Sequence, residues 1–124
     1  MTLYPRSIRI FIAVGLPAVV ERLRPQPGDI VLTKHRYSAF QRSNLEPLLR
    51  ARKRDQLIVC GVFAHIGCLM TVGDAFQRDI EPFLVADAVA DFSREMHDFA
   101  VRYVADCCGV PMTTRQLEAA LNDQ

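Results

Sequence analysis

Two residues have the chemistry and the placement of a reactive site: Lys34, which ends the apolar stretch 29–34, and Gly67, in the turn 64–67 after the apolar run 57–63. An ammonium group can hold a carboxylate by charge. A glycine at a helix N-terminus lets a substrate approach the backbone closely, where free N–H groups stabilise an anion or a developing oxyanion. The structural alternatives are a β–α turn without chemistry and a surface lysine that caps a strand.

The elements that position these residues follow from the apolar pattern. The run 57–63 is unbroken and rich in β-branched residues, which predicts a strand buried on both faces. After Phe63 the apolar residues change to helical spacing, so a helix is expected directly after the turn. Because the carboxyl ends of parallel strands meet at one edge of a sheet, Lys34 and Gly67 are expected on the same rim.

The rest of the chain completes an α/β pattern. The two acids that follow the third strand, Asp87 and Asp91, are expected to cap helices or hold loops. The other predicted elements are a helix from a capping box at 43–46, a strand at 82–86, a helix at 94–108, an edge strand at 110–112 and a helix from a capping box at 113–116. This succession predicts a three-layer α/β/α sandwich with a mainly parallel sheet.

Composition narrows the class of protein. The chain has 124 residues, half of them hydrophobic, and a net charge of +1, so neither a nucleic acid nor a membrane surface is indicated as a partner. The basic run 50–54 is interpreted as the solvated end of a helix.

Four cysteines without C-x-x-C spacing are typical of reduced thiols in a cytosolic protein. Adjacent Cys107 and Cys108 are poor zinc ligands, and no metal site is predicted.

Residues 1–19 do not fit this pattern. Arg6 and Arg9 precede the apolar stretch 10–16, which has the outline of a signal peptide. No small-x-small cleavage site follows, and the stretch is too short to span a bilayer. We interpret 1–19 as an atypical N-terminal segment, and 20–124 as the domain.

Three motifs, in order, carry a resemblance to a known family: KHRYSAF, GVFAHIGC and DAFQRDIEPFLVADAVADFS. Together they resemble the isochorismatase branch of the isochorismatase-like (cysteine) hydrolases, from about Val20 to Leu121. The resemblance implies the isochorismatase-like hydrolase fold, incomplete at its N-terminus, in a cytoplasmic homo-oligomer without a cofactor. It also implies that isochorismate is hydrolysed at its vinyl ether to pyruvate and 2,3-dihydro-2,3-dihydroxybenzoate, a precursor of catechol siderophores.

The resemblance assigns roles to individual residues. Lys34 matches the site lysine, and Gly67 stands where the cysteine members of the superfamily have their nucleophile, as is usual in the isochorismatase branch. Phe63 takes a position often held by Tyr, and the peptide Phe63–Ala64 matches a cis bond beside the substrate. The loop that contains Arg36 and Phe40 is expected to wall the substrate pocket.

One feature of the family has no match here. The family's general acid is an Asp at the end of its first strand, whereas the first acids in this chain, Glu21 and Asp29, do not follow an apolar strand. Two other interpretations therefore stay open. One is a non-catalytic fragment or pseudoenzyme that acts through dimerisation. The other is a cysteine amidase that uses Cys68, one residue beyond the family's nucleophile position.

Overall fold

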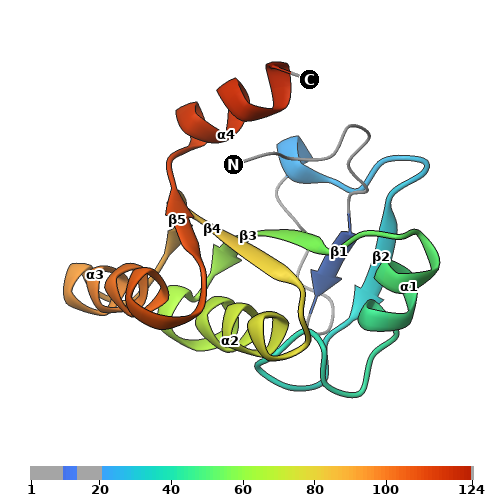
Figure 1. Ribbon diagram of the computed structural model, residues 1–124, viewed down its shortest axis with the longest axis horizontal. Helices are drawn as coiled ribbons and strands as arrows, with labels where there is room; N and C mark the ends of the chain where they lie inside the picture. The colour runs from blue at the N-terminus through green and yellow to red at the C-terminus, as the bar shows by residue number, and fades with distance from the viewer. Residues whose placement is uncertain (1–9, 14–20, 124) are drawn as a thin grey trace.

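A mainly parallel sheet with helices on both faces forms the fold (Figure 1). The structure is a computed structural model that describes residues 10–13 and 21–123. The strands are β1 (Ile10–Ala13), β2 (Ile30–Thr33), β3 (Gln56–Val62), β4 (Glu81–Ala90) and β5 (Val110–Met112). The helices are α1 (Leu45–Ala51), α2 (Leu69–Gln77), α3 (Arg94–Tyr103) and α4 (Thr114–Asn122), with a short 3₁₀ turn at Glu21–Leu23 and π-helical turns at Ala64–Cys68 and Val104–Cys108.

All recorded strand pairs are parallel, as predicted. They form two groups, β1 beside β2 and the ladder β3-β4-β5. No strand was predicted in the apolar stretch at 10–16, but Ile10–Ala13 forms β1 and pairs with Ile30–Thr33. Four residues are too few to separate a strand from any other short apolar run by periodicity. The rest of segment 1–19 lies outside the described residues.

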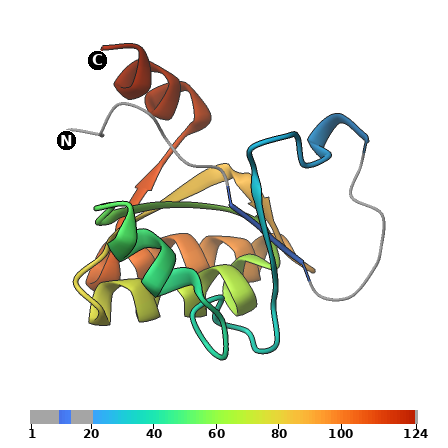
Figure 2. The same ribbon diagram turned by 90° about the vertical axis from the view of Figure 1, so that its right-hand side faces the viewer.

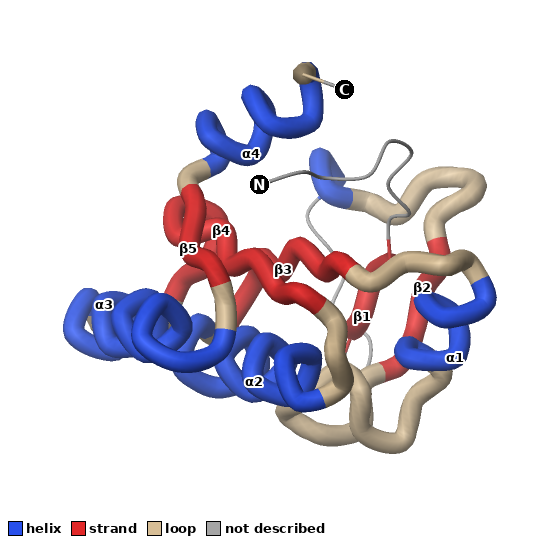
Figure 3. The backbone as a smooth tube through the Cα atoms, in the orientation of Figure 1, coloured by secondary structure: helices blue, strands red, loops and turns tan. Residues whose placement is uncertain are grey.

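Alternating side chains of β4 divide the core between the two faces of the sheet. Leu84 packs in the cluster that contains Val72 of α2 and Ala100 of α3. Phe83 and Val85 point the other way, into a cluster against which Leu117 of α4 packs. Because successive side chains on a strand face opposite sides, one strand serves both layers. Figures 2 and 3 show α2 and α3 on one side of the strands and α4 on the other.

The ends of the predicted helices are confirmed in part. Thr113 and Gln116 form the expected capping box at the start of α4. The box expected at 43–46 does not form, because Asn44 caps α1 without a side-chain hydrogen bond. Ser43 instead donates to the carbonyl oxygen of Ala39 at 2.5 Å. None of the described helices is long and apolar enough to cross a lipid bilayer.

Candidate functional site

The end of β3 brings Gly67 to the rim of the sheet through an irregular turn. The pairing of β3 with β4 shifts register between Val59 and Gly61, and Gly61 has a φ of +121°, a conformation that favours glycine. A cis peptide bond follows, which the structure places at Val62–Phe63 rather than at the expected Phe63–Ala64. The chain then winds through the π-helical turn into α2. A bulge beside a turn is a common way to re-aim a strand end toward a site.

Most of the backbone N–H groups in this turn are already occupied. The amides of Ile66 and Cys68 both donate to the carbonyl oxygen of Phe63, at 3.1 and 3.2 Å. The amide of His65 donates to the carboxylate of Asp91 at 2.8 Å. The N–H groups that the sequence led us to expect free are therefore largely occupied by Phe63 and Asp91. Any positive charge offered to an anion here must come chiefly from a side chain.

That side chain is Lys34, which reaches Gly67 from the end of β2. If Gly67 carried a Cβ, this atom would lie 2.5 Å from the Lys34 ammonium nitrogen and 3.4 Å from the carbonyl oxygen of Tyr37. Lys34 is half-buried, and within the described part of the chain it forms no ion pair. The structure thus brings Lys34 and Gly67 together, as predicted. The ammonium group of Lys34 occupies the space that the side chain of any larger residue at position 67 would fill.

The loop after Lys34 is held against α2 by a polar network. Ser38 donates its hydroxyl to Asp74 at 2.7 Å, and the amide of Ala39 donates to the hydroxyl of Thr71 at 3.0 Å. Arg78 donates to Asp74 at 2.8 Å and to Glu46 of α1 at 2.6 Å. Burial works to raise the pKa of Asp74, but the hydrogen bonds from Arg78 and Ser38 outweigh it and hold the pKa below its ordinary value. The carboxylate therefore stays charged and fixes the loop.

A second carboxylate, Asp91 at the end of β4, holds the turn from the other side. Its side chain is fully buried and accepts from the His65 amide, from the His65 ring nitrogen Nδ1 at 2.6 Å and from the Phe92 amide. Burial works to raise the pKa of Asp91, but these hydrogen bonds outweigh it, so the pKa lies below its ordinary value. Asp87 similarly accepts from the amide and hydroxyl of Thr114. Asp91 thus holds a turn, and Asp87, which lies within β4 rather than after it, binds the first residue of α4, so both acids have the structural role that was expected.

The other predicted site residues are distributed around this pair. Ala64 is fully buried in the turn, and Phe63 is partly exposed and stacks on Phe92 with ring centroids 4.1 Å apart. Arg36 lies on the surface and donates to the carbonyl oxygen of His35. Phe40 lies in the core cluster with Leu45 of α1, rather than in an open wall. The role of Phe40 in substrate binding stays a prediction, because the structure shows only how this residue packs in the core.

Cys68 points into the core and does not resemble an activated thiol. It is buried in the cluster that also contains Val72 and Val104. This burial raises the pKa of its thiol to about 11, even though the Lys34 charge works in the opposite direction. A catalytic cysteine needs a lowered pKa and access to solvent. The geometry therefore gives no support to the amidase interpretation.

Several residues that shape the site were not singled out from the sequence: His65, Thr71, Asp74 and Phe92. The spacing of Asp74 and Arg78, four residues apart on one helix, is a signal for an ion pair, but it does not reveal the loop that the pair also holds. Within residues 10–13 and 21–123 no group of three or more potential ligands could hold a metal ion.

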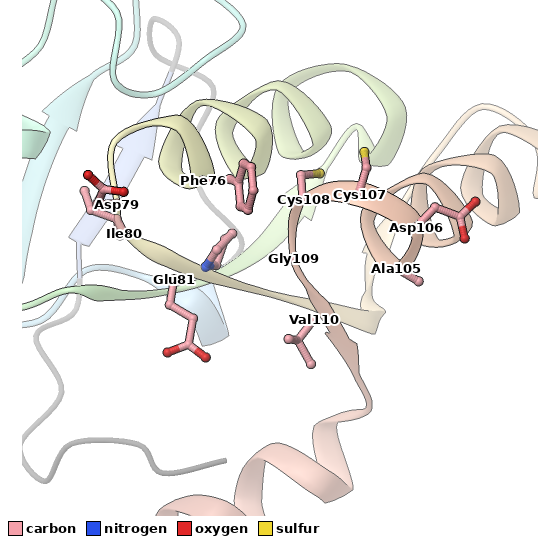
Figure 4. Close-up of a pocket in the computed structure, with 11 residues that line it drawn as sticks. Phe76, Asp79, Ile80, Glu81, Ala105, Asp106, Cys107, Cys108, Gly109 and Val110 are labelled. Carbon is pink, nitrogen blue, oxygen red and sulfur yellow. The ribbon is translucent and has the colours of Figure 1, made fainter.

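An open groove lies elsewhere on the molecule, at the amino ends of β4 and β5 (Figure 4). Its lining includes Phe76, Glu81, Cys107 and Val110, and none of the predicted site residues. The groove is therefore at the opposite edge of the sheet from Lys34 and Gly67, which stand at strand carboxyl ends. In open parallel sheets ligands usually bind at the carboxyl ends, so we take the rim around Gly67 as the candidate active site.

Known proteins with similar sequences share most of this chain. A "Probable isochorismatase" of Pseudomonas chlororaphis is 54% identical over 99 residues, which cover 80% of this chain and 48% of that protein. "Enterobactin synthase component B" of Escherichia coli K12 is 56% identical over 99 residues, covering 80% of this chain and 35% of that protein. The chain thus spans half or less of the length of these relatives.

A solved structure and a family model agree with the sequence comparisons. The crystal structure of a cysteine hydrolase from Pseudomonas syringae pv. phaseolicola superposes with a TM-score of 0.81 at 28% identity, covering 85% of this chain and 55% of that one. The model of the isochorismatase domain matches residues 13–116, which include β2 through the first part of α4 and both candidate site residues. The chain belongs to the isochorismatase family.

Proposed function

We propose that this chain carries the lysine and glycine half of an isochorismatase active site. In this proposal the completed site hydrolyses isochorismate to 2,3-dihydro-2,3-dihydroxybenzoate and pyruvate. The observation that carries the proposal is the contact of the Lys34 ammonium group with the open backbone at Gly67. Family membership supplies the reaction class, and the named relatives fit it.

The proposed chemistry needs no covalent nucleophile. A proton is added to the terminal carbon of the enolpyruvyl group, and water attacks the oxocarbenium ion that results. The hemiketal then collapses to pyruvate and the ring alcohol. Isochorismate carries two carboxylates, and the Lys34 ammonium group is placed to hold one of them by charge, an interaction that is strong where water is excluded. Gly67 allows the reacting group to approach the turn.

The residue that donates the proton in this mechanism is not Asp91. Asp91 does not fit the role, because its carboxylate accepts three hydrogen bonds and its pKa lies below the ordinary value. Such a group remains an anion at neutral pH and cannot supply a proton. Residues 1–20 contain no Asp or Glu, so in the proposed enzyme the acid is supplied by another acidic residue of this chain or by a second chain. A general acid contributes about 10²–10⁴-fold to the rate.

Further properties belong to the same proposal. We place the enzyme in siderophore-type metabolism, which fits the relative named for enterobactin synthesis. A cytoplasmic location is supported by the four cysteines, all of which are free thiols. We also propose that the enzyme is a homo-oligomer.

A non-catalytic role is the second candidate. It is favoured by one observation: no acidic side chain within the described residues forms an ion pair with Lys34. Under this candidate the scaffold persists and acts through association with another chain, without turnover.

Pyruvate release from isochorismate, measured with lactate dehydrogenase, tests both candidates. The hydrolase proposal predicts pyruvate release by the purified chain. Lys34→Ala should abolish this release, and Arg94→Ala, which removes an exposed charge paired with Asp98 on the surface of α3, should leave it unchanged. A folded chain that releases no pyruvate would contradict an active site in this chain and favour the non-catalytic role. Release that survives Lys34→Ala would contradict the assignment of the lysine.

A further inference from the structure

Cys107 and Cys108 form a pair of neighbouring thiols that the proposed function does not use. Both are free thiols on the π-helical turn Val104–Cys108, directly before β5, and both line the groove at the amino ends of β4 and β5 (Figure 4). Cys107 is exposed, whereas Cys108 is only 7% exposed. A small molecule that enters the groove therefore meets both residues.

The two thiols are in contact with each other in the folded chain. Side chains of consecutive residues in a regular helix do not face each other. Here the helix ends in a π-helical turn, and Gly109 after it is extended, with a φ of −173°. The Cys107 thiol donates to the carbonyl oxygen of Tyr103 at 3.4 Å, and it also forms a hydrogen bond with the Cys108 thiol. A ligand that binds both sulfur atoms therefore finds them already side by side.

The surroundings disfavour reagents that need a thiolate or that carry a negative charge. Burial, together with the hydrogen bond with Cys107, raises the pKa of the Cys108 thiol to about 11, so this thiol is protonated at neutral pH. Alkylation and disulfide exchange require the thiolate and are slow at such a group. The charged residues that line the groove are Asp79, Glu81 and Asp106, and they repel anions. The reagent that fits is uncharged and reacts with protonated thiols.

Trivalent arsenic has this chemistry. Arsenous acid and its derivatives with one organic substituent are uncharged at neutral pH, and sulfur is a soft ligand that prefers soft centres. Two As–S bonds form, and the two thiol protons leave with an oxygen of the arsenical as water. Arsenic stays trivalent throughout, so no oxidant or reductant is needed, and no net charge develops in the groove. Such a reaction is not held back by a raised thiol pKa.

The number of ligands separates this site from a metal site. A structural zinc ion takes four protein ligands, and within residues 10–13 and 21–123 no group of three or more potential ligands occurs. An arsenical with one organic substituent needs only two sulfur atoms. Because the two thiols are in contact before binding, little further ordering is required to close the ring. We propose that Cys107 and Cys108 form a binding site for trivalent arsenicals, held through both sulfur atoms.

Intact mass spectrometry of the natural chain with phenylarsine oxide tests this proposal. One phenylarsenic group is expected to add, with the loss of one water. Ethanedithiol should remove it, whereas glutathione at the same concentration of thiol groups should not, because only a dithiol competes for both As–S bonds. After free reagent has been removed, alkylation with iodoacetamide in urea should label Cys60 and Cys68 but neither Cys107 nor Cys108.

Three variants show whether both thiols of the pair are used. Cys107→Ser and Cys108→Ala each leave a single thiol of the pair, and each is expected to weaken phenylarsine oxide binding by about 10²-fold or more, because the second bond no longer forms within one site. Cys60→Ser removes an exposed thiol of β3 and is the matched control, with binding expected to be unchanged. Since Cys107 is exposed, Cys107→Ser is expected to stay folded, and circular dichroism checks this even if Cys108→Ala does not fold.

The outcomes that overturn the proposal are specific to this site. A natural chain that takes up no phenylarsenic group contradicts it. So does binding that Cys107→Ser leaves unchanged, or protection from iodoacetamide that falls on Cys60 and Cys68 instead. None of these results depends on turnover of isochorismate.

Discussion

At the scale of single residues, the geometry of the site depends on the absence of a side chain at position 67. The Lys34 ammonium nitrogen occupies the space beside Gly67 that a side chain would need. In the cysteine hydrolases that this family resembles, the nucleophile stands at this position. The two arrangements exclude each other sterically here, because a side chain at 67 and the present position of the ammonium group cannot coexist. The proposed role of Lys34 at the substrate therefore depends on the absence of a side chain at position 67.

Gly67→Ala is expected to displace the Lys34 ammonium group, because the new methyl carbon would lie 2.5 Å from its nitrogen. The sequence has two lysines, Lys34 and Lys53, so ¹⁵N-labelled lysine gives two ammonium signals in an NMR spectrum. We expect the Lys34 signal to shift and the Lys53 signal to stay. An unchanged Lys34 signal would show that the two residues are not in contact.

Gly73→Ala is the matched control for this substitution. Gly73 lies within α2, and a Cβ there meets nothing within 4 Å. Alanine is favoured over glycine in a helix interior by about 1 kcal/mol. Urea denaturation should therefore show a higher free energy of unfolding for Gly73→Ala, with both lysine signals unchanged. A destabilised protein would mean that position 73 is more crowded than the structure shows.

Cys68 is expected to react with iodoacetamide only as its thiol ionises at high pH. Burial raises the pKa of this thiol to about 11, so about one thiol in a thousand is ionised at pH 8. The alkylation rate of the native chain, followed by mass spectrometry, should still rise tenfold per pH unit at about pH 9. The same cysteine in the urea-unfolded chain should level off near the ordinary pKa of about 8.5. A plateau near pH 8 in the native chain would revive the amidase interpretation.

At the scale of elements, two buried or half-buried carboxylates hold the pieces of the rim in place. Asp74 of α2 fixes the loop that follows Lys34, and Asp91 at the end of β4 fixes the turn that contains Gly67. The ends of β2, β3 and β4 are thus connected by side chains, although no ladder joins β2 to β3 in the described residues. The placement of Lys34 beside Gly67 depends on these two anchors.

Asp91→Ala is expected to destabilise the protein and to change its response to acid. The substitution leaves the amides of His65 and Phe92 without their acceptor, at a cost of about 1–3 kcal/mol. Because the pKa of Asp91 is lowered in the folded state, its stabilisation is complete above about pH 4, the unfolded value, and is lost as the pH falls through the folded value. Urea denaturation at pH 7 and below pH 4 should show a smaller loss of stability on acidification in the variant. An equal loss in both proteins would contradict this role.

Two helix caps give a matched comparison. Thr113 forms a complete capping box with Gln116, whereas Asn44 caps α1 without a side-chain hydrogen bond. Thr113→Ala is therefore expected to lower the free energy of unfolding by about 1 kcal/mol, and Asn44→Ala to have little effect. Equal losses in thermal or urea denaturation would show that the two caps do not differ as the hydrogen bonds indicate.

The sequence predicted the positions of the helices and strands better than the strand pairing and the side-chain contacts between them. The run 57–63 predicted β3 to within one residue, because apolar residues on both faces leave few alternatives. The prediction for the next strand ended at residue 86, but β4 continues to Ala90, since its last residues pair with β3 beyond the register shift at Val59 and Gly61. The anchors of the rim were missed for a similar reason. Ser38 and Asp74 are 36 positions apart, and no local pattern relates them.

At the scale of the whole molecule, the two edges of the sheet have different characters. The carboxyl edge brings together Lys34, Gly67 and the aromatic pair of Phe63 and Phe92. The amino edge has the open groove, whose charged lining residues are all acidic. A substrate with two carboxylates is attracted to the Lys34 ammonium group and repelled by the acidic lining of the groove. Binding of such a substrate should therefore distinguish the two edges even in the absence of turnover.

The measurement that tests this account most directly is a titration of the ¹⁵N-labelled chain with isochorismate, followed by backbone amide shifts. We expect the largest changes at Lys34, Gly67 and Cys68, and their loss in Lys34→Ala, whether or not pyruvate is released. Amides in the groove, such as those of Asp79 and Val110, should not move. Shifts that gather in the groove, or shifts at the rim that Lys34→Ala does not change, would contradict the assignment of the active site.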